Sequence, residues 1–145
     1  MDISEDAVKY ASDANRKMVD EGRLTVKTAS AENLPFPDNT FDLVSAFETY
    51  FFWKDLKKGI SEAHRVLVPG GCFTVISEQY PHPDFDERNA EIAERTGLTL
   101  VGNTELMNIM RRAGFEVSYS TVEENNWVCF VAKKQTSPVS PDDAE

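Results

Sequence analysis

The sequence predicts an α/β fold in which a mixed sheet carries helices on both faces. Helix-like and strand-like periodicities alternate along most of the chain, and a hairpin pattern follows near its C-terminal end. The 145 residues, 41% of them apolar, are enough for one compact core. We therefore expect a single domain over residues 1–134 and a disordered acidic tail over residues 135–145.

The first predicted element is a helix over residues 4–21. Ser4 is a favourable N-cap, acidic residues follow it in the first turn, and small or apolar residues recur every three or four positions. Gly22 offers a left-handed stop. β-Branched residues alternate over residues 24–28, which predicts a short strand.

The middle of the chain then alternates loop, strand and helix. Two prolines predict a loop over residues 33–40, and the apolar run at 41–46 predicts a buried strand. Apolar residues fall on one helical face over residues 54–67, and the Pro-Gly-Gly run at 69–71 is expected to end that helix abruptly. A continuous apolar strand is expected at residues 72–77.

The remaining elements complete the predicted fold. A proline-containing loop over residues 80–86 precedes two helical patterns, at 87–95 and at 104–113. Alternating residues at 115–121 and 127–132 flank a polar turn and predict an antiparallel hairpin.

Composition narrows the class of partner. Nucleic-acid binding needs a basic surface that contacts phosphates, and the sequence has a net charge of −10, a pI near 4.7 and no basic cluster. Small molecules or proteins are therefore the expected partners. No apolar run has membrane-spanning length and no secretion signal is visible, so we expect a cytoplasmic protein without a membrane partner. Cys72 and Cys129 are expected as buried free thiols. With two histidines in the chain and no ligand spacing, no metal site is predicted.

Candidate ligand-binding residues follow from the positions of the strands. In a parallel α/β sheet ligands bind at the carboxyl ends of the strands, which places Asp2, residues 29–32, 46–48 and 77–80 at the candidate site. An acid directly before a helix can accept hydrogen bonds from two ribose hydroxyls. The alternative for Asp2 is a capping role at the start of that helix.

An aromatic cluster follows the strand at residues 41–46. Its rings could form an apolar wall for a substrate, or could pack the next helix onto the sheet. We favour packing for Phe52 and Trp53, and take Glu48 and Tyr50 as the substrate-side candidates.

The two histidines lie in different contexts. His64 falls in the last turn of a predicted helix, where a structural role is favoured. His82 lies between two prolines in a loop after a strand end, which makes it a substrate-side candidate and a possible general base, although a solvated loop histidine is the alternative. No residue is assigned as catalytic.

Two segments together are more specific than any single residue. Residues 29–44 read A-S-A-E-N-L-P-F-P-D-N-T-F-D-L-V, and residues 65–71 read R-V-L-V-P-G-G. In combination they resemble the class I S-adenosylmethionine-dependent methyltransferases of the small-molecule type, over about residues 2–77. The resemblance implies a Rossmann-like methyltransferase sheet and S-adenosyl-L-methionine as the cofactor.

The resemblance also implies roles for six residues. Asp2 takes the position of the acid that binds the ribose. Ser30, Ala31 and Glu32 fall at the segment beside the adenine. Ala46 and Phe47 match the strand end that passes the methionine part of the cofactor.

The family has a further strand and a glycine-rich loop just upstream of the matched region, and the chain begins where these should have ended. The resemblance therefore predicts an incomplete sheet, truncated at its N-terminal side, with unpaired backbone near its centre. Three arrangements would repair this: residues 24–28 move beside residues 41–46, another chain supplies the edge, or a preceding segment belongs to a longer protein.

The expected function is that of a methyltransferase, or its C-terminal fragment, that transfers a methyl group to an unidentified small molecule. Without the glycine-rich loop we expect weak or undetectable cofactor binding by the isolated chain. The alternative is a non-catalytic module for dimerisation or partner binding, with a homodimer formed through an exposed sheet edge.

Overall fold

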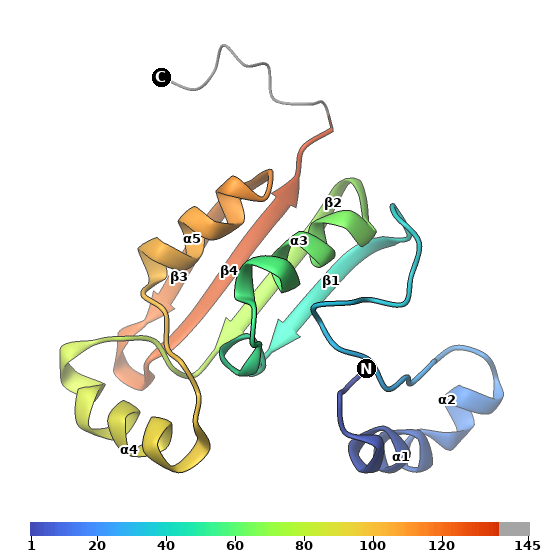
Figure 1. Cartoon of the computed structure of the whole chain (residues 1–145), viewed down its shortest axis with the longest axis horizontal. Helices are drawn as coiled ribbons and strands as arrows, with labels where there is room; N and C mark the ends of the chain where they lie inside the picture. Colours follow the sequence, from blue (N-terminus) through green and yellow to red (C-terminus); the bar gives the residue numbers. More distant parts are fainter. Residues whose placement is uncertain (137–145) are drawn as a thin grey trace.

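The computed structural model describes residues 1–136, and its helices flank a mixed four-stranded sheet (Figure 1). The helices are α1 (Glu5–Ala14), α2 (Arg16–Asp20), α3 (Leu56–Val66), α4 (Asp86–Thr96) and α5 (Asn103–Arg112). The strands are β1 (Phe41–Phe47), β2 (Leu67–Ser77), β3 (Phe115–Val122) and β4 (Trp127–Lys134). Three short 3-10 helices add η1 (Tyr50–Phe52), η2 (Pro83–Phe85) and η3 (Glu123–Asn125). From residue 137 on, the predicted tail lies outside the described residues.

The sheet has the strand order β1-β2-β4-β3. β1 and β2 are parallel, whereas β4 is antiparallel to both β2 and β3. The predicted α/β class and the C-terminal hairpin are therefore confirmed. Because β1 and β2 are parallel, their carboxyl ends lie at the same edge of the sheet.

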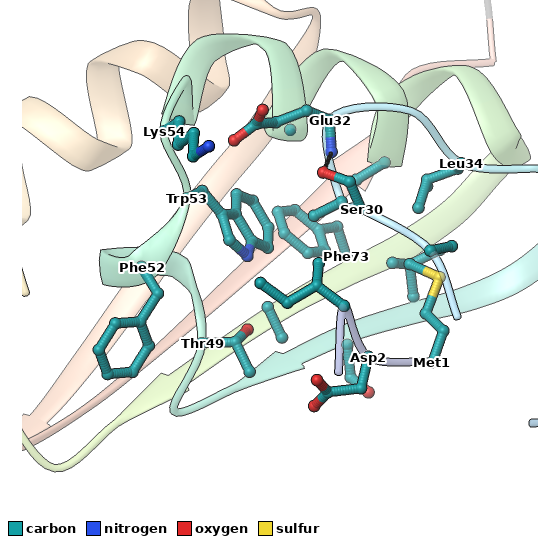
Figure 2. Close-up of a pocket in the computed structure, with 18 residues that line it drawn as sticks. Met1, Asp2, Ser30, Glu32, Leu34, Thr49, Phe52, Trp53, Lys54 and Phe73 are labelled. Atoms are coloured by element: carbon teal, nitrogen blue, oxygen red, sulfur yellow. Dashed lines mark hydrogen bonds between the residues drawn. The ribbon is translucent and has the colours of Figure 1, made fainter. Parts of the chain in front are cut away.

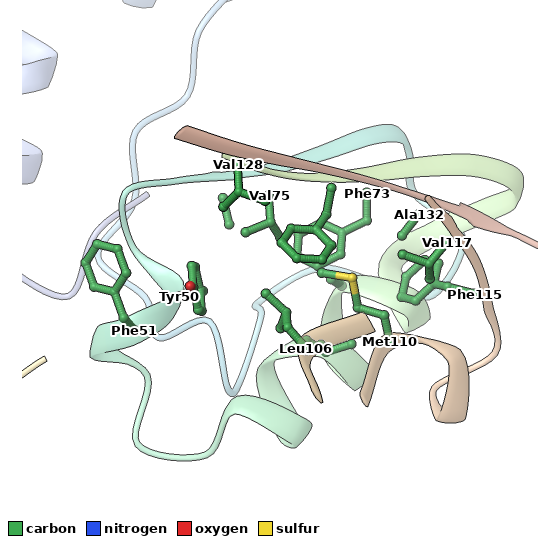
Figure 3. Close-up of a cluster of buried hydrophobic side chains, with 14 of the residues drawn as sticks. Tyr50, Phe51, Phe73, Val75, Leu106, Met110, Phe115, Val117, Val128 and Ala132 are labelled. Atoms are coloured by element: carbon green, nitrogen blue, oxygen red, sulfur yellow. The ribbon is translucent and has the colours of Figure 1, made fainter. Parts of the chain in front are cut away.

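One face of the sheet is covered by α3 and α5, which also contact each other. Figure 3 shows the core beneath these helices, where side chains of β2, β4 and α5 meet. Ile60, Phe73, Leu106, Met110 and Phe130 are almost completely buried there. Burial of this apolar surface is the main source of stability in a domain of this size.

The opposite face of the sheet exposes apolar side chains, and we call this the open face. Leu43 is 60% exposed and Phe47 is 54% exposed, and Val131 of β4 lies on the same side. The sequence predicted helices on both faces, whereas α3 and α5 lie together on the other face. An exposed apolar area of this kind marks an interaction surface or an incomplete layer.

The N-terminal helix forms, with a break. The Ser4 hydroxyl accepts a hydrogen bond from the Ala7 amide at 3.2 Å, as the predicted N-cap requires. At Asn15 the side-chain amide donates to the Ala11 carbonyl, and the single predicted helix divides into α1 and α2. α1 has no buried residue.

The predicted strand over residues 24–28 is wrong. Thr28 makes one isolated parallel bridge with Asp2, in which the Ala29 amide donates to the Asp2 carbonyl at 2.9 Å. A strand needs a neighbouring ladder to satisfy its backbone, and this segment has one bridge instead of a ladder. It has therefore not moved beside β1, which rules out the first of the three repairs.

The Pro-Gly-Gly run lies inside a strand rather than between two elements. α3 ends at Val66 and β2 begins at Leu67 without an intervening loop. The β1–β2 register shifts between Phe41 and Leu43, and residues 68–71 bulge at that place. Gly70 has a φ of +82°, which a glycine adopts without strain.

Two other details differ from the sequence prediction. α5 begins at Asn103, one residue before the predicted helical pattern at 104–113, and Gly102 is its N-cap. Cys72 and Cys129 are free thiols but half-buried, because both side chains lie on the open face. Among the described residues, no helix combines the length and apolar character that crossing a membrane would need.

Candidate functional site

A cavity of about 790 Å³ lies between β1 and the N-terminal segments (Figure 2). One wall is formed by β1 together with the turn that follows it, and the other by residues near Asp2 and Ser30. The lining residues are Met1, Asp2, Ile3, Ala29, Ser30, Ala31, Glu32, Leu34, Val44, Ser45, Ala46, Thr49, Phe52, Trp53, Lys54, Gly59, Ala63 and Phe73. This volume lies within the range of about 300–1,000 Å³ that small-molecule sites have.

Asp2 reaches the cavity because its backbone is bridged to Thr28. Its Oδ1 accepts a hydrogen bond at 2.9 Å from the amide of Ser4, the N-cap of α1, so Asp2 assists the capping of that helix without being the cap itself. The residue is exposed and lines the cavity as well. Capping and ligand binding are compatible here, since a carboxylate offers two acceptor oxygens.

The segment Ser30–Glu32 is held against the start of α3. The Ser30 hydroxyl accepts a hydrogen bond from the Glu32 amide at 3.2 Å. Oε1 of Glu32 accepts from the Asp55 amide at 3.0 Å, and Asp55 is the N-cap of α3. Glu32 therefore ties this loop to the residues that follow η1.

The two signature segments of the sequence contact each other through Arg65. Its guanidinium donates to the carbonyls of Leu34 and Phe36 and to the carboxylates of Asp38 and Glu62, at distances of 2.7–3.1 Å. The hydrogen bond from Arg65 lowers the pKa of Glu62, whose Oε2 also accepts from the Leu34 amide. The arginine of R-V-L-V-P-G-G thus fixes the L-P-F-P-D loop beside the cavity.

The aromatic cluster is arranged differently from the sequence prediction. Phe52 and Trp53, for which packing was favoured, line the cavity, and Trp53 also packs against the core as expected. Tyr50 was expected on the substrate side, but it is 2% exposed and belongs to the core with Phe51. The 3-10 turn η1 explains the exchange, since it turns Tyr50 and Phe51 inward and leaves Phe52 outside.

Glu48 lies at the end of β1 but does not line the cavity. Its amide donates to the Ile76 carbonyl at 3.0 Å, and its Oε1 accepts from the Glu78 amide, so it links the ends of β1 and β2. Burial raises the pKa of Glu48. Its φ of +53° is unusual for a residue with a side chain.

Tyr50 and Glu48 are close enough to affect each other. Burial, and then the charge of Glu48, raise the pKa of Tyr50 to about 12. The Tyr50 hydroxyl has no hydrogen-bond partner within residues 1–136. A buried hydroxyl without a hydrogen-bond partner costs free energy, so the Tyr50 hydroxyl lowers the stability of the fold at the end of β1.

Phe47 and the two histidines lie away from the cavity. The Phe47 ring lies on the open face, 6.1 Å from the ring centre of Trp127. Nδ1 of His82 accepts from the Asp84 amide at 3.3 Å and caps η2, whereas His64 packs edge-on against Phe115 and burial lowers its pKa. Of the six cofactor candidates, the cavity therefore brings together Asp2, Ser30, Ala31, Glu32 and Ala46. Of the three substrate-side candidates, Glu48, Tyr50 and His82, it includes none.

Sequence reasoning missed the apolar part of the cavity and its lysine. Met1, Ile3, Leu34 and Phe73 line it together with Lys54. Met1, Ile3 and Leu34 lie close in sequence to the candidates Asp2 and Ser30–Glu32. Their apolar character next to a candidate is the signal that could have identified them. Over residues 1–136, no group of three or more histidine, cysteine or acidic side chains is close enough to hold a metal ion.

Comparison with known proteins relates this geometry to one family. A family model described as "Methyltransferase domain" matches residues 1–75. The O-methyltransferase cnsE of Penicillium expansum is 30% identical over 128 residues, which are 85% of this chain and 45% of that protein. The uncharacterized methyltransferase YdaC of Bacillus subtilis is 26% identical over 137 residues, covering 92% of this chain and 68% of that protein.

Solved structures share the fold. The crystal structure of the cyclase SpnF superposes with a TM-score of 0.78 at 20% identity, over 93% of this chain and 64% of that chain. At that identity the likeness concerns the fold and not the reaction. The chain spans less than half the length of cnsE.

Proposed function

The chain belongs to the methyltransferase-domain family, within the class I S-adenosylmethionine-dependent methyltransferases, and on this premise we propose that it takes part in methyl transfer to a small molecule. The observation that carries the proposal is the cavity, where five of the six residues that the family resemblance assigns to the cofactor lie together. The family implies S-adenosyl-L-methionine as the cofactor.

The residues of the cavity fit the nucleoside part of that cofactor. The Asp2 carboxylate can accept hydrogen bonds from ribose hydroxyls, and the Ser30–Glu32 segment offers polar and backbone groups beside a flat ring. Apolar side chains such as Ala46 and Phe73 exclude water from the remaining wall. When bound there, the cofactor would supply a methyl group that its sulfonium makes electrophilic.

Methyl transfer mainly requires that nucleophile and methyl group are held in line. The described residues provide no glycine-rich loop at the cavity, and such loops bind anionic groups through backbone amides. We expect weak or undetectable binding of S-adenosyl-L-methionine by the 145-residue chain. In a calorimetric titration, micromolar affinity would contradict this expectation.

A matched pair of variants tests the cofactor assignment. In Asp2→Asn the amide oxygen still accepts from the Ser4 amide, so the helix cap is kept while the charge is lost. Asp6→Asn removes an exposed charge from α1, away from the cavity lining. With S-adenosylhomocysteine at millimolar concentration as the probe, saturation-transfer NMR should weaken for Asp2→Asn alone. Equal signals for both variants would refute the role of Asp2.

A second candidate function is a dimerisation module, and the exposed β1 supports it. β1 pairs with β2 on one side, and its residues Leu43 and Phe47 are exposed. Unpaired strand edges with apolar neighbours associate readily. We propose a homodimer through this edge, which Leu43→Lys should convert into a monomer in a light-scattering mass measurement. A strictly monomeric wild-type chain would contradict the dimer.

A further inference from the structure

Trp53 is placed in the cavity by a contact with a glycine. A Cβ atom added at Gly59 would lie 2.4 Å from Cε3 and 2.8 Å from Cζ3 of Trp53, so the benzene part of the indole rests on the backbone of α3. Glycine in a helix interior costs about 1 kcal/mol relative to alanine. The chain thus places an unfavourable helix residue at the point where the ring needs room.

The remainder of the indole is available to a ligand. Trp53 is half-buried and lines the cavity, where Figure 2 shows it among the surrounding side chains. Within residues 1–136, no other aromatic ring or cation packs against it. A flat apolar surface that is fixed from one side and open on the other suits stacking with a flat ligand.

The position of Trp53 favours a purine over the sulfonium as its ligand. Glu32 binds the Asp55 amide at 3.0 Å, which ties the Ser30–Glu32 segment to the residues directly after Trp53. Asp2 and Ser30, which carry the polar groups suited to a nucleoside, line the same cavity.

We propose that Trp53 is the platform on which the adenine ring of the cofactor stacks, with Gly59 as the residue that positions the indole. This inference rests on the proposed function, because it takes the cavity as the nucleoside site. It assigns the recognition of the ring to an aromatic face, in addition to the polar groups of Ser30–Glu32. It adds a ligand contact to the packing role that the sequence favoured for Trp53.

The chain allows a direct optical test. It contains two tryptophans, and Trp127 lies on β4 outside the cavity lining, so Trp127→Phe leaves Trp53 as the sole tryptophan. Adenosine is titrated into this variant of the 145-residue chain at up to millimolar concentration. We expect saturable quenching of Trp53 emission, with S-adenosylhomocysteine giving the same effect because both carry the purine.

Substitutions at Trp53 separate the effect of ring stacking from the effect of apolar volume. Trp53→Leu keeps apolar volume without a ring and should weaken adenosine binding at least about fivefold, measured by saturation-transfer NMR, whereas Trp53→Phe should recover part of the loss. Gly59→Ala displaces the indole and should shift its emission and weaken binding, with circular dichroism as the check on folding. If Gly59→Ala unfolds the chain, the comparison of adenosine binding by Trp53→Leu and Trp53→Phe tests the platform.

The outcomes distinguish this inference from the proposed function. Adenosine binding that is the same in Trp53→Leu overturns the platform and leaves the methyltransferase assignment intact. Quenching by S-adenosyl-L-methionine alone points to the sulfonium and also overturns the platform. Adenosine binding that depends on Trp53, together with equal binding by Asp2→Asn and Asp6→Asn, supports the platform and refutes the role of Asp2. Absence of adenosine binding at millimolar concentration overturns the platform and agrees with the undetectable cofactor binding allowed under the proposed function.

Discussion

Lys134 is expected to hold the junction between α3 and β2 together. Its ammonium donates to the carbonyl of Leu67 at 2.7 Å, to the carbonyl of His64 at 2.8 Å, and to Oδ1 of Asn39 at 3.0 Å. These three bonds use all the protons that a lysine can donate. Two of the acceptors are backbone carbonyls at the end of α3, where helices lack partners of their own.

Replacement of Lys134 by methionine keeps the apolar stem and removes the donor. Leu67 is completely buried, and a buried carbonyl that loses its partner costs about 1–3 kcal/mol. Loss of the bond to the half-buried His64 carbonyl adds less to the destabilisation, because water can replace the ammonium. Loss of the bond to the exposed Asn39 adds little. The free energy of unfolding should therefore fall by about 2–3 kcal/mol.

Urea unfolding followed by tryptophan fluorescence measures this loss. With a slope of about 2 kcal/mol per molar urea, the midpoint should fall by about 1–1.5 M. Lys133→Met is the matched control, because Lys133 is exposed on the adjacent position of β4. An equal fall in both variants would attribute the effect to net charge, and an unchanged midpoint in Lys134→Met would refute the reasoning.

Three further predictions concern the end of β1 and the bulge in β2. Tyr50→Phe removes a buried hydroxyl without a partner, so the thermal midpoint should not fall, and the tyrosine that ionises near pH 12 should vanish from a spectrophotometric titration. Burial raises the pKa of Glu48 above its ordinary value of 4.5, so the folded state binds the proton more tightly. The resulting stabilisation is present below pH 4.5 and is lost as pH rises through the folded-state pKa. Urea midpoints of the wild type should therefore decline toward neutral pH relative to Glu48→Gln, and parallel curves would contradict this. Gly71→Ala brings a Cβ to 2.9 Å from the Val68 carbonyl oxygen and should cost about 1–3 kcal/mol in urea unfolding, whereas Gly102→Ala, with no atom within 4 Å, should cost less.

Most of the fold could be predicted because its elements depend on local pattern. The apolar stripe of α3 and the alternation of the C-terminal hairpin correspond to burial seen in the structure. β1 forms at the predicted place, but it is mostly exposed instead of buried, because one of its faces belongs to the open face. Five cofactor candidates lie together for a related reason. Asp2 precedes α1, Ala46 lies at the carboxyl end of β1, and Ser30–Glu32 follow the isolated bridge at Thr28, so chain topology brings them to one edge.

The errors arose where a neighbour in space decides the outcome. Residues 24–28 have strand-like composition, but a strand requires a ladder, and one bridge to Asp2 is all this segment makes. Pro69-Gly70-Gly71 has the composition of a helix stop, yet residues 68–71 form a bulge that the β1–β2 register accommodates. The exchange of Tyr50 and Trp53 depends on a 3-10 turn and on the space above Gly59, and neither is visible as a periodicity.

The open face has a practical consequence for work with this protein. Environment-sensitive dyes such as anilinonaphthalene sulfonate bind exposed apolar surface, which is why they report molten states. Leu43, Phe47 and Val131 present such a surface in the folded chain. A strong dye signal at low temperature is thus expected from native protein, and dye-based melting curves would underestimate how well the chain is folded.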